Sequence, residues 1–60
     1  MKHFRVTFEV HRGSSHKEFK TISVEAGNKK LAAIRGMISI NQLNGYSNLF
    51  KNIVRIEEEN

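Results

Sequence analysis

Residues 3–11 read His-Phe-Arg-Val-Thr-Phe-Glu-Val-His, and polar and apolar side chains alternate along the whole stretch. The apolar side chains all fall on one side of an extended backbone; they are Phe4, Val6, Phe8 and Val10. Aromatic and β-branched residues with a period of two are typical of a strand that has one buried face. The stretch therefore predicts a half-buried β-strand on which the other elements must pack.

A second alternating run follows after a short turn. Residues 12–16, Arg-Gly-Ser-Ser-His, form a cluster of turn residues, and residues 18–25 alternate again with Ile22 and Val24 on one face. Two alternating runs around a short Gly-Ser loop are typical of an antiparallel hairpin. We expect a second strand over residues 18–25, paired with the first.

Helical periodicity replaces the alternation in the third part of the chain. The apolar stripe is centred on Leu31, Ile34 and Ile38 and is widened by Ala33, Met37 and Ile40. Asn28 is a suitable N-cap, and Asn44-Gly45 is a typical stop signal. The pattern predicts a helix over residues 28–42. Gly36 costs about 1 kcal/mol relative to Ala there, and it either allows close packing on the sheet or ends the helix early.

The last alternating run, residues 49–57, predicts a third strand. Uninterrupted alternation turns Phe50, Val54 and Ile56 toward the core, and it turns away Leu49, Lys51, Ile53, Arg55 and Glu57. The order ββαβ predicts an α+β fold, in which the helix covers one face of a three-stranded, mainly antiparallel sheet. We expect the first strand at the centre (order 2-1-3), a single domain over residues 1–57, and a frayed acidic tail over residues 58–60.

The composition excludes several classes of protein. The 60-residue chain has ten Lys and Arg, six Glu, no Asp and no Cys, and its formal net charge is +4. Without Cys there are neither disulfides nor thiolate zinc sites. A domain of this size has a thin core and little room for a deep substrate pocket, so we expect no enzymatic activity and no cofactor. His3 and His11 lie about 26 Å apart along the first strand, too far to bind one metal ion.

The sequence also shows no targeting signal. No apolar stretch of signal-peptide length follows the N-terminal residues, and none reaches the roughly 20 residues of a membrane span. We therefore expect a cytoplasmic protein that makes no use of a membrane. Because the chain begins with Met and carries no tag, we also expect a complete small gene product.

Two surfaces are candidates for function. The first is the uncovered face of the sheet, where exposed apolar residues are typical of a protein contact. Its candidate partner-binding residues are Arg5, Thr7, Phe19, Lys51, Ile53 and Arg55. The second is the hairpin tip and, as a separate site, the helix start, whose cations suit the phosphates of a nucleic acid; they are Arg12, His16 and Lys17 at the tip and Lys29 and Lys30 at the helix start. Each surface is equally compatible with ordinary solvated side chains.

Four features of the chain carry a resemblance. They are the run Phe4–Glu9, the alternation through Ile22 and Val24, the alanines Ala32 and Ala33, and Val54-Arg55-Ile56. In these features the chain resembles the small early proteins of bacteriophages, including those of phages such as T7 that inhibit the host RNA polymerase. The resemblance implies that an Arg of the last strand contacts the polymerase, and Arg55 is the matching position. Glutamates stand where that family has a second Arg, and the helix here is basic rather than acidic.

These observations point to a binding protein rather than an enzyme. We expect a small regulatory protein that docks on a host protein, in the transcription or nucleic-acid machinery, and modulates it by occlusion. The alternative is a basic nucleic-acid-binding module that uses the open sheet face and the hairpin tip. The outer strands have free edges that accept another strand, so the chain is either a monomer or a homodimer paired through such an edge.

Overall fold

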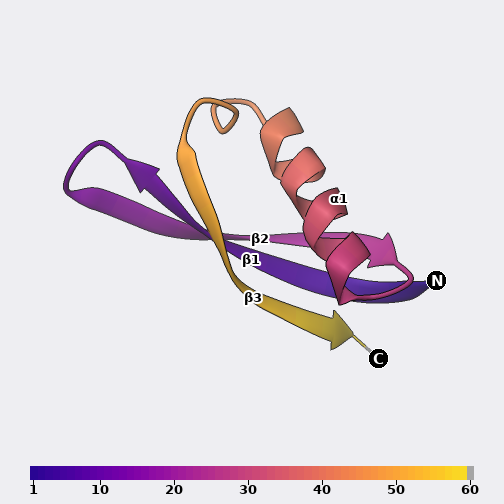
Figure 1. Cartoon of the computed structure of the whole chain (residues 1–60). Helices are drawn as coiled ribbons and strands as arrows, with labels where there is room; N and C mark the ends of the chain where they lie inside the picture. The colour runs from indigo at the N-terminus through magenta and orange to yellow at the C-terminus, as the bar shows by residue number, and fades with distance from the viewer. Residues whose placement is uncertain (60) are drawn as a thin grey trace.

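The chain forms a three-stranded antiparallel sheet with one helix on it (Figure 1). The computed structural model describes residues 1–59. Its elements are β1 (Lys2–Arg12), β2 (His16–Ala26), α1 (Lys29–Gln42) and β3 (Phe50–Glu59). Strand β1 lies in the middle, in the order β2-β1-β3, and pairs antiparallel with both neighbours. The predicted α+β fold, strand order and single helix are therefore confirmed.

The β1–β2 hairpin is regular from end to end. Eleven residue pairs run from Lys2 opposite Ala26 to Arg12 opposite His16 without a shift of register. Gly13 has a φ of +73°, a left-handed conformation that glycine adopts without steric cost, and it lets the three-residue turn close. The hairpin tip extends beyond the end of α1, which covers only the other part of the sheet (Figure 1).

The helix begins and ends close to where the sequence predicts. The side chain of Asn28 accepts a hydrogen bond from the backbone N–H of Leu31 at 2.9 Å, so Asn28 is the N-cap. Gly36 does not end the helix, which continues to Gln42; the N–H of Leu43 then donates to the carbonyl of Ile40 at 3.1 Å. The chain crosses back to β3 through the turns of residues 43–49.

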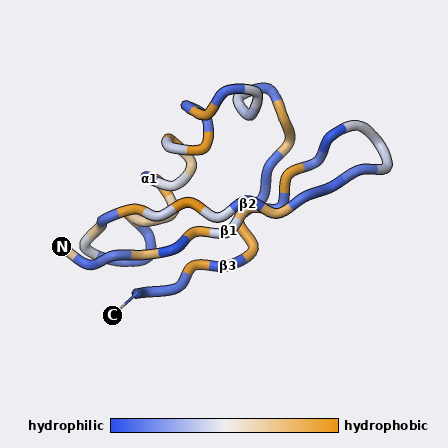
Figure 2. The backbone as a smooth tube through the Cα atoms, turned by 180° about the vertical axis from the view of Figure 1, so that it is seen from behind, coloured by the Kyte–Doolittle hydropathy of each residue, from blue (hydrophilic) through white to orange (hydrophobic). Residues whose placement is uncertain are grey.

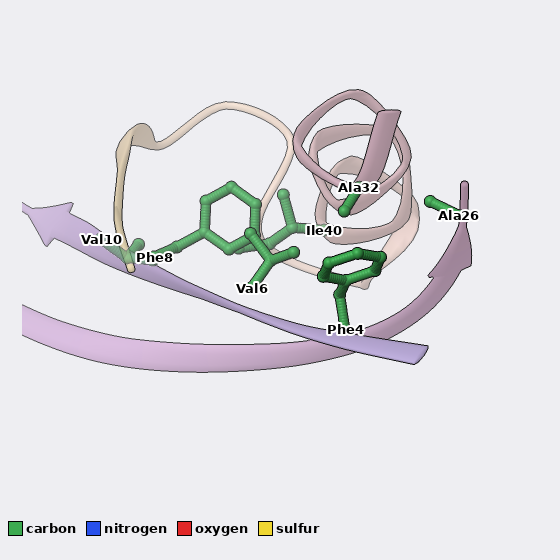
Figure 3. Close-up of a cluster of buried hydrophobic side chains, with 7 residues drawn as sticks. All are labelled: Phe4, Val6, Phe8, Val10, Ala26, Ala32 and Ile40. Atoms are coloured by element: carbon green, nitrogen blue, oxygen red, sulfur yellow. The ribbon is translucent and has the colours of Figure 1, made fainter. Parts of the chain in front are cut away.

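A small core lies between the sheet and the helix (Figure 3). It contains all four apolar residues of the alternating stretch in β1 and three small or medium residues from β2 and α1; the seven are Phe4, Val6, Phe8, Val10, Ala26, Ala32 and Ile40. None of the seven is more than 1% exposed. The central strand thus supplies most of the core, because only this strand has a neighbour on each side and a layer above it.

The helix buries a different face from the one that the sequence predicts. Its buried residues are Ala32, Gly36 and Ile40, whereas Leu31, Ile34 and Ile38 are 42%, 50% and 54% exposed. In Figure 2, orange hydrophobic segments alternate with hydrophilic ones along α1. The reason is the close approach of α1 to β1: a Cβ atom at Gly36 would lie 3.1 Å from the side chain of Val6, so this face of the helix has small residues there, beside the buried Ile40.

A bulge reverses the expected orientation of the first half of β3. Thr7 lies opposite Arg55 but its neighbour Phe8 lies opposite Ile53, so β3 has one extra residue at this point. Residues directly opposite each other share a face of the sheet. Ile53 therefore lies on the core side, with Leu49 also packed against the core, while Phe50 and Val54 are 64% and 50% exposed. The predictions for all four residues were wrong.

The predicted acidic tail is largely part of the sheet. Glu58 and Glu59 lie opposite Phe4 and His3, so β3 extends two residues beyond the predicted end at residue 57. Glu58 also forms an ion pair with Lys2 at 3.8 Å. The third tail residue, Asn60, lies outside the described residues. The carboxylates are thus placed along the strand instead of in a separate segment.

Candidate functional site: the open sheet face

The face of the sheet opposite α1 is uncovered, and we call it the open sheet face. Pairing with the odd-numbered residues of β1 defines its members. From β1, β2 and β3 in turn they are His3, Arg5, Thr7, Glu9 and His11; Lys17, Phe19, Thr21, Ser23 and Glu25; and Phe50, Asn52, Arg55, Glu57 and Glu59. Four of the six predicted partner-binding residues, Arg5, Thr7, Phe19 and Arg55, lie on this face.

Two phenylalanines lie on the two outer strands of the open sheet face. Phe19 in β2 is 61% exposed and lies opposite Glu9, whereas Phe50 in β3 is 64% exposed and lies opposite His11. The rings of His11 and Phe50 meet edge to face, with their centroids 5.4 Å apart. A large apolar side chain left in water on each side of the central strand is the strongest indication of a contact surface on this molecule.

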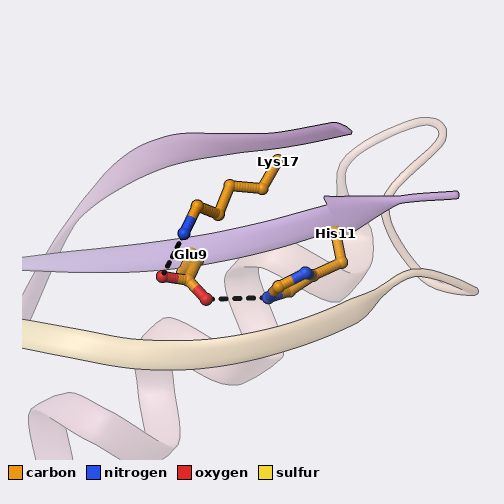
Figure 4. A network of polar contacts seen from close by, with 3 residues as sticks. All are labelled: Glu9, His11 and Lys17. Atoms are coloured by element: carbon orange, nitrogen blue, oxygen red, sulfur yellow. Dashed lines mark hydrogen bonds and ion pairs between the residues drawn. The ribbon is translucent and has the colours of Figure 1, made fainter. Parts of the chain in front are cut away.

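Glu9, His11 and Lys17 form a polar cluster on the open sheet face (Figure 4). The carboxylate of Glu9 lies 2.7 Å from the Nε2 atom of His11 and 3.9 Å from the Nζ atom of Lys17. Glu9 is half-buried, so its carboxylate is held between two potential cations instead of extending into solvent. The arrangement keeps the centre of the surface polar and orients the His11 ring toward Phe50.

The other end of the open sheet face is polar. The hydroxyls of Thr7 and Thr21 form a hydrogen bond of 3.2 Å across β1 and β2. Arg55 lies opposite Thr7, and its Nε atom forms an ion pair of 3.5 Å with Glu57. The side chain of Arg55 remains 66% exposed, so it is available to a partner's carboxylate.

The charge on the open sheet face is mixed. It contains three Lys or Arg residues and four Glu residues, so the face has a slight excess of negative charge when its histidines are neutral. The basic character of the chain therefore does not extend to this surface. The cations lie elsewhere, and three of them, Lys29, Lys30 and Arg35, belong to α1, which has no acidic residue.

Lys51 and Ile53 do not belong to the open sheet face, contrary to the sequence prediction. The bulge in β3 turns both toward the core side, where Lys51 lies opposite Val10 and Ile53 opposite Phe8. The Nζ atom of Lys51 donates to the carbonyls of Tyr46 and Leu49 at 2.7 and 2.9 Å. Lys51 thus satisfies backbone groups of the preceding turns, which is a structural role.

Phe50 is the residue of this face that the sequence analysis missed. Ile53 and Val54 are adjacent apolar residues in the middle of β3, and such a pair is the available signal for a bulge at this point. An alternation that changes phase at this point places Phe50 on the open sheet face.

The five residues predicted to bind nucleic acid do not form one site. Arg12, His16 and Lys17 lie at the hairpin tip, while Lys29 and Lys30 follow the far end of β2, which is 11 residues or about 33 Å long. A single phosphate-binding surface would therefore have to span the whole molecule. The distribution of these cations explains why no dense basic patch forms.

The cations of the hairpin tip are also engaged within the chain. Arg12 donates a hydrogen bond to Glu18, and its guanidinium lies over the ring of Tyr46, 5.0 Å from the centroid. The hydrogen bond from Arg12 lowers the pKa of Glu18 below its ordinary value. Lys17 is paired with Glu9, as described above.

Two kinds of feature, a metal site and a membrane-spanning helix, are not found within residues 1–59. No three His, Cys, Asp or Glu side chains in this range lie close enough together to hold a metal ion. Within the same range, no helix has the length and apolar character needed to cross a membrane. An open groove of about 400 Å³ lies between β2 and α1 and is lined by Ser23, Val24, Glu25, Arg35, Ile38 and Ser39.

Comparison with known proteins gives no relative for this chain. No protein-family model matches it, and neither a curated protein nor a solved structure shows significant similarity to it.

Proposed function

We propose that this chain is a small, non-enzymatic binding protein that docks its open sheet face on another protein and modulates that partner by occlusion. The observation that carries the proposal is the pair of exposed phenylalanines, Phe19 and Phe50, on either side of the central strand. Aromatic residues are enriched at the centres of protein interfaces, where they fill pockets of the partner. Arg5 and Arg55 add exposed cations beside them.

Charge favours a protein over a nucleic acid as the partner. The His11–Phe50 contact offers a ring on which a base can stack, which is the feature that speaks for the alternative. Against it, four carboxylates lie on the same face and repel phosphates, and the remaining predicted phosphate-binding cations lie at opposite ends of the molecule. A partner with a mixed-charge surface and an apolar pocket fits the face better.

The resemblance to small phage early proteins directs the search for the partner to bacterial transcription and nucleic-acid machinery. Tagged protein is incubated with nuclease-treated bacterial lysate, and a captured protein is purified and its binding measured directly. We expect Phe19→Ser or Phe50→Ser to weaken this binding at least tenfold, because each removes an aromatic anchor. Arg55→Ala should weaken it less, since its charge lies in solvent.

Controls separate a lost contact from a lost fold. Ile38→Ser removes an equally exposed apolar residue from α1, on the other side of the molecule, and should leave partner binding unchanged. Circular dichroism should show the same fold for all variants. The proposal is wrong if both phenylalanine variants bind the partner as tightly as the wild type. It is also wrong if the purified protein binds only DNA or RNA, with log K falling linearly with log salt.

A further inference from the structure

The outer edge of β2 is a second, separate surface. Strand β2 pairs with β1 alone, and its register is continuous over 11 residues. The other edge strand, β3, is interrupted by the bulge and ends in three glutamates, both of which discourage pairing with another strand. The free edge of β2 has neither a bulge nor a proline.

The direction of the backbone groups on this edge follows from one hydrogen bond. The Nη1 atom of Arg35 donates to the backbone carbonyl of Glu25 at 3.1 Å, so this carbonyl points away from β1. Hydrogen-bonded and non-hydrogen-bonded pairs alternate along an antiparallel ladder. The backbone groups of Ser23 and Thr21 therefore also point outward, and they are available to another strand.

Apolar surface lies beside the same edge. Ile38 is 54% exposed and lines the open groove between α1 and β2 together with Ser23 and Val24. Leu31 and Ile34 continue this apolar side of α1 and are 42% and 50% exposed. A partner that pairs with the edge of β2 would thus cover apolar side chains of the helix at the same time.

We propose that this edge pairs with the β2 edge of a second copy of the chain, about a two-fold axis at Thr21. Thr21 is the midpoint of His16–Ala26, so this register overlaps both strands over their whole length, and the carbonyl of Glu25 would accept from the Lys17 amide of the other copy as well as from Arg35. Each Lys17 then lies opposite the Glu25 of the other copy, on the same face of a continuous six-stranded sheet.

The charges of β2 are compatible with this register, and its full-length overlap distinguishes it from shifted registers. In the same arrangement Glu18 lies opposite Val24 and Lys20 opposite Ile22, so no like charges meet. A shift of the axis by one residue, to Lys20, would place Lys20 of one copy opposite Lys20 of the other, so that two like charges would meet. The symmetric dimer buries the free edge, closes the assembly and leaves the open sheet face of both copies uncovered.

Charge reversal tests the register directly. Mass is measured by light scattering across a concentration series, and we expect it to rise from 6.9 kDa to twice that value. Lys17→Glu alone or Glu25→Lys alone places like charges opposite each other at both ends and should weaken the dimer about tenfold. The double variant Lys17→Glu/Glu25→Lys restores both pairs, and its dissociation constant should return to within about threefold of the wild type.

Two further variants separate this edge from other surfaces. N-methylation of the Thr21 amide in a synthetic chain removes one outward donor without touching the β1–β2 ladder, and it should abolish the dimer while circular dichroism stays unchanged. Ile38→Ser should weaken the dimer, and Phe50→Ser, on the opposite edge strand, should not. A mass of 6.9 kDa into the millimolar range, an open-ended series of larger species, or no recovery in the double variant would each overturn the proposal.

Discussion

Replacement of Gly36 by Ala tests how closely α1 approaches the sheet. A Cβ atom at this position would lie 3.1 Å from each of three side-chain carbons of Val6. Val6 is fully buried, so its side chain has no free space into which it can move. In an exposed helix the same substitution would be stabilising, because Ala favours the helix by about 1 kcal/mol over Gly.

The two effects have opposite signs, and their sizes decide the outcome. Overpacking a close-packed site costs about 1–3 kcal/mol, so Gly36→Ala should lower the free energy of unfolding by about 0–2 kcal/mol after the helix gain is subtracted. Val6→Ala removes two buried carbon groups and should cost about 2 kcal/mol. In the double variant two of the three close contacts, those with the Cγ atoms of Val6, disappear while the helix gain remains, so the net loss should fall to about 1 kcal/mol.

Urea denaturation followed by circular dichroism, at one fixed protein concentration, measures all four proteins of this cycle. The expected coupling between positions 6 and 36 is about 1–3 kcal/mol in favour of the double variant. Additivity within about 0.5 kcal/mol would refute the close approach. So would a full stabilisation of about 1 kcal/mol by Gly36→Ala alone, since it would mean that the helix has room at this residue.

Three further perturbations test the core, the helix cap and the hairpin tip. Phe8→Ala should cost about 3–5 kcal/mol, which is close to the whole stability of a domain of this size, and should therefore unfold the chain. Phe19→Ala should change the free energy of unfolding by less than about 0.5 kcal/mol, because Phe19 is exposed. Dispersion of the amide NMR signals distinguishes a folded from an unfolded variant. Asn28→Ala should lower the free energy of unfolding by about 1 kcal/mol, whereas Asn28→Asp should keep most of the cap's stabilisation, because Asp can accept the same hydrogen bond. Urea midpoints measure both effects, and equal losses in the two variants would contradict the role of Asn28 as N-cap. The carboxylate of Glu18 should titrate by NMR below the ordinary value of 4.5, and Arg12→Gln should raise its pKa, because the hydrogen bond from Arg12 is the largest cause of the lowering. Because the folded pKa of Glu18 is the lower one, the stabilisation from this pair is present above about pH 4.5 and is lost as the pH falls through the folded pKa; an unchanged inflection in Arg12→Gln would exclude the hydrogen bond as the cause.

The amino-acid sequence by itself determined the local features of this protein. The alternation of residues 3–11 placed Phe4, Val6, Phe8 and Val10 in the core, and the turn residues after it predicted the hairpin. Asn28 predicted the start of the helix. Each of these features depends on neighbouring residues, whose pattern the sequence displays directly.

Only the tertiary structure decided which faces are used. The side of α1 that contains Leu31, Ile34 and Ile38 remains outside, because the helix lies so close to Val6 that a small residue, Gly36, is needed at the contact. The bulge opposite Thr7 and Phe8 changes the phase of β3, and it brings Phe50 to the open sheet face. Both outcomes depend on how distant segments fill a shared volume and settle a register between strands. The candidate site therefore emerged in full only from contacts that no single stretch of the chain contains.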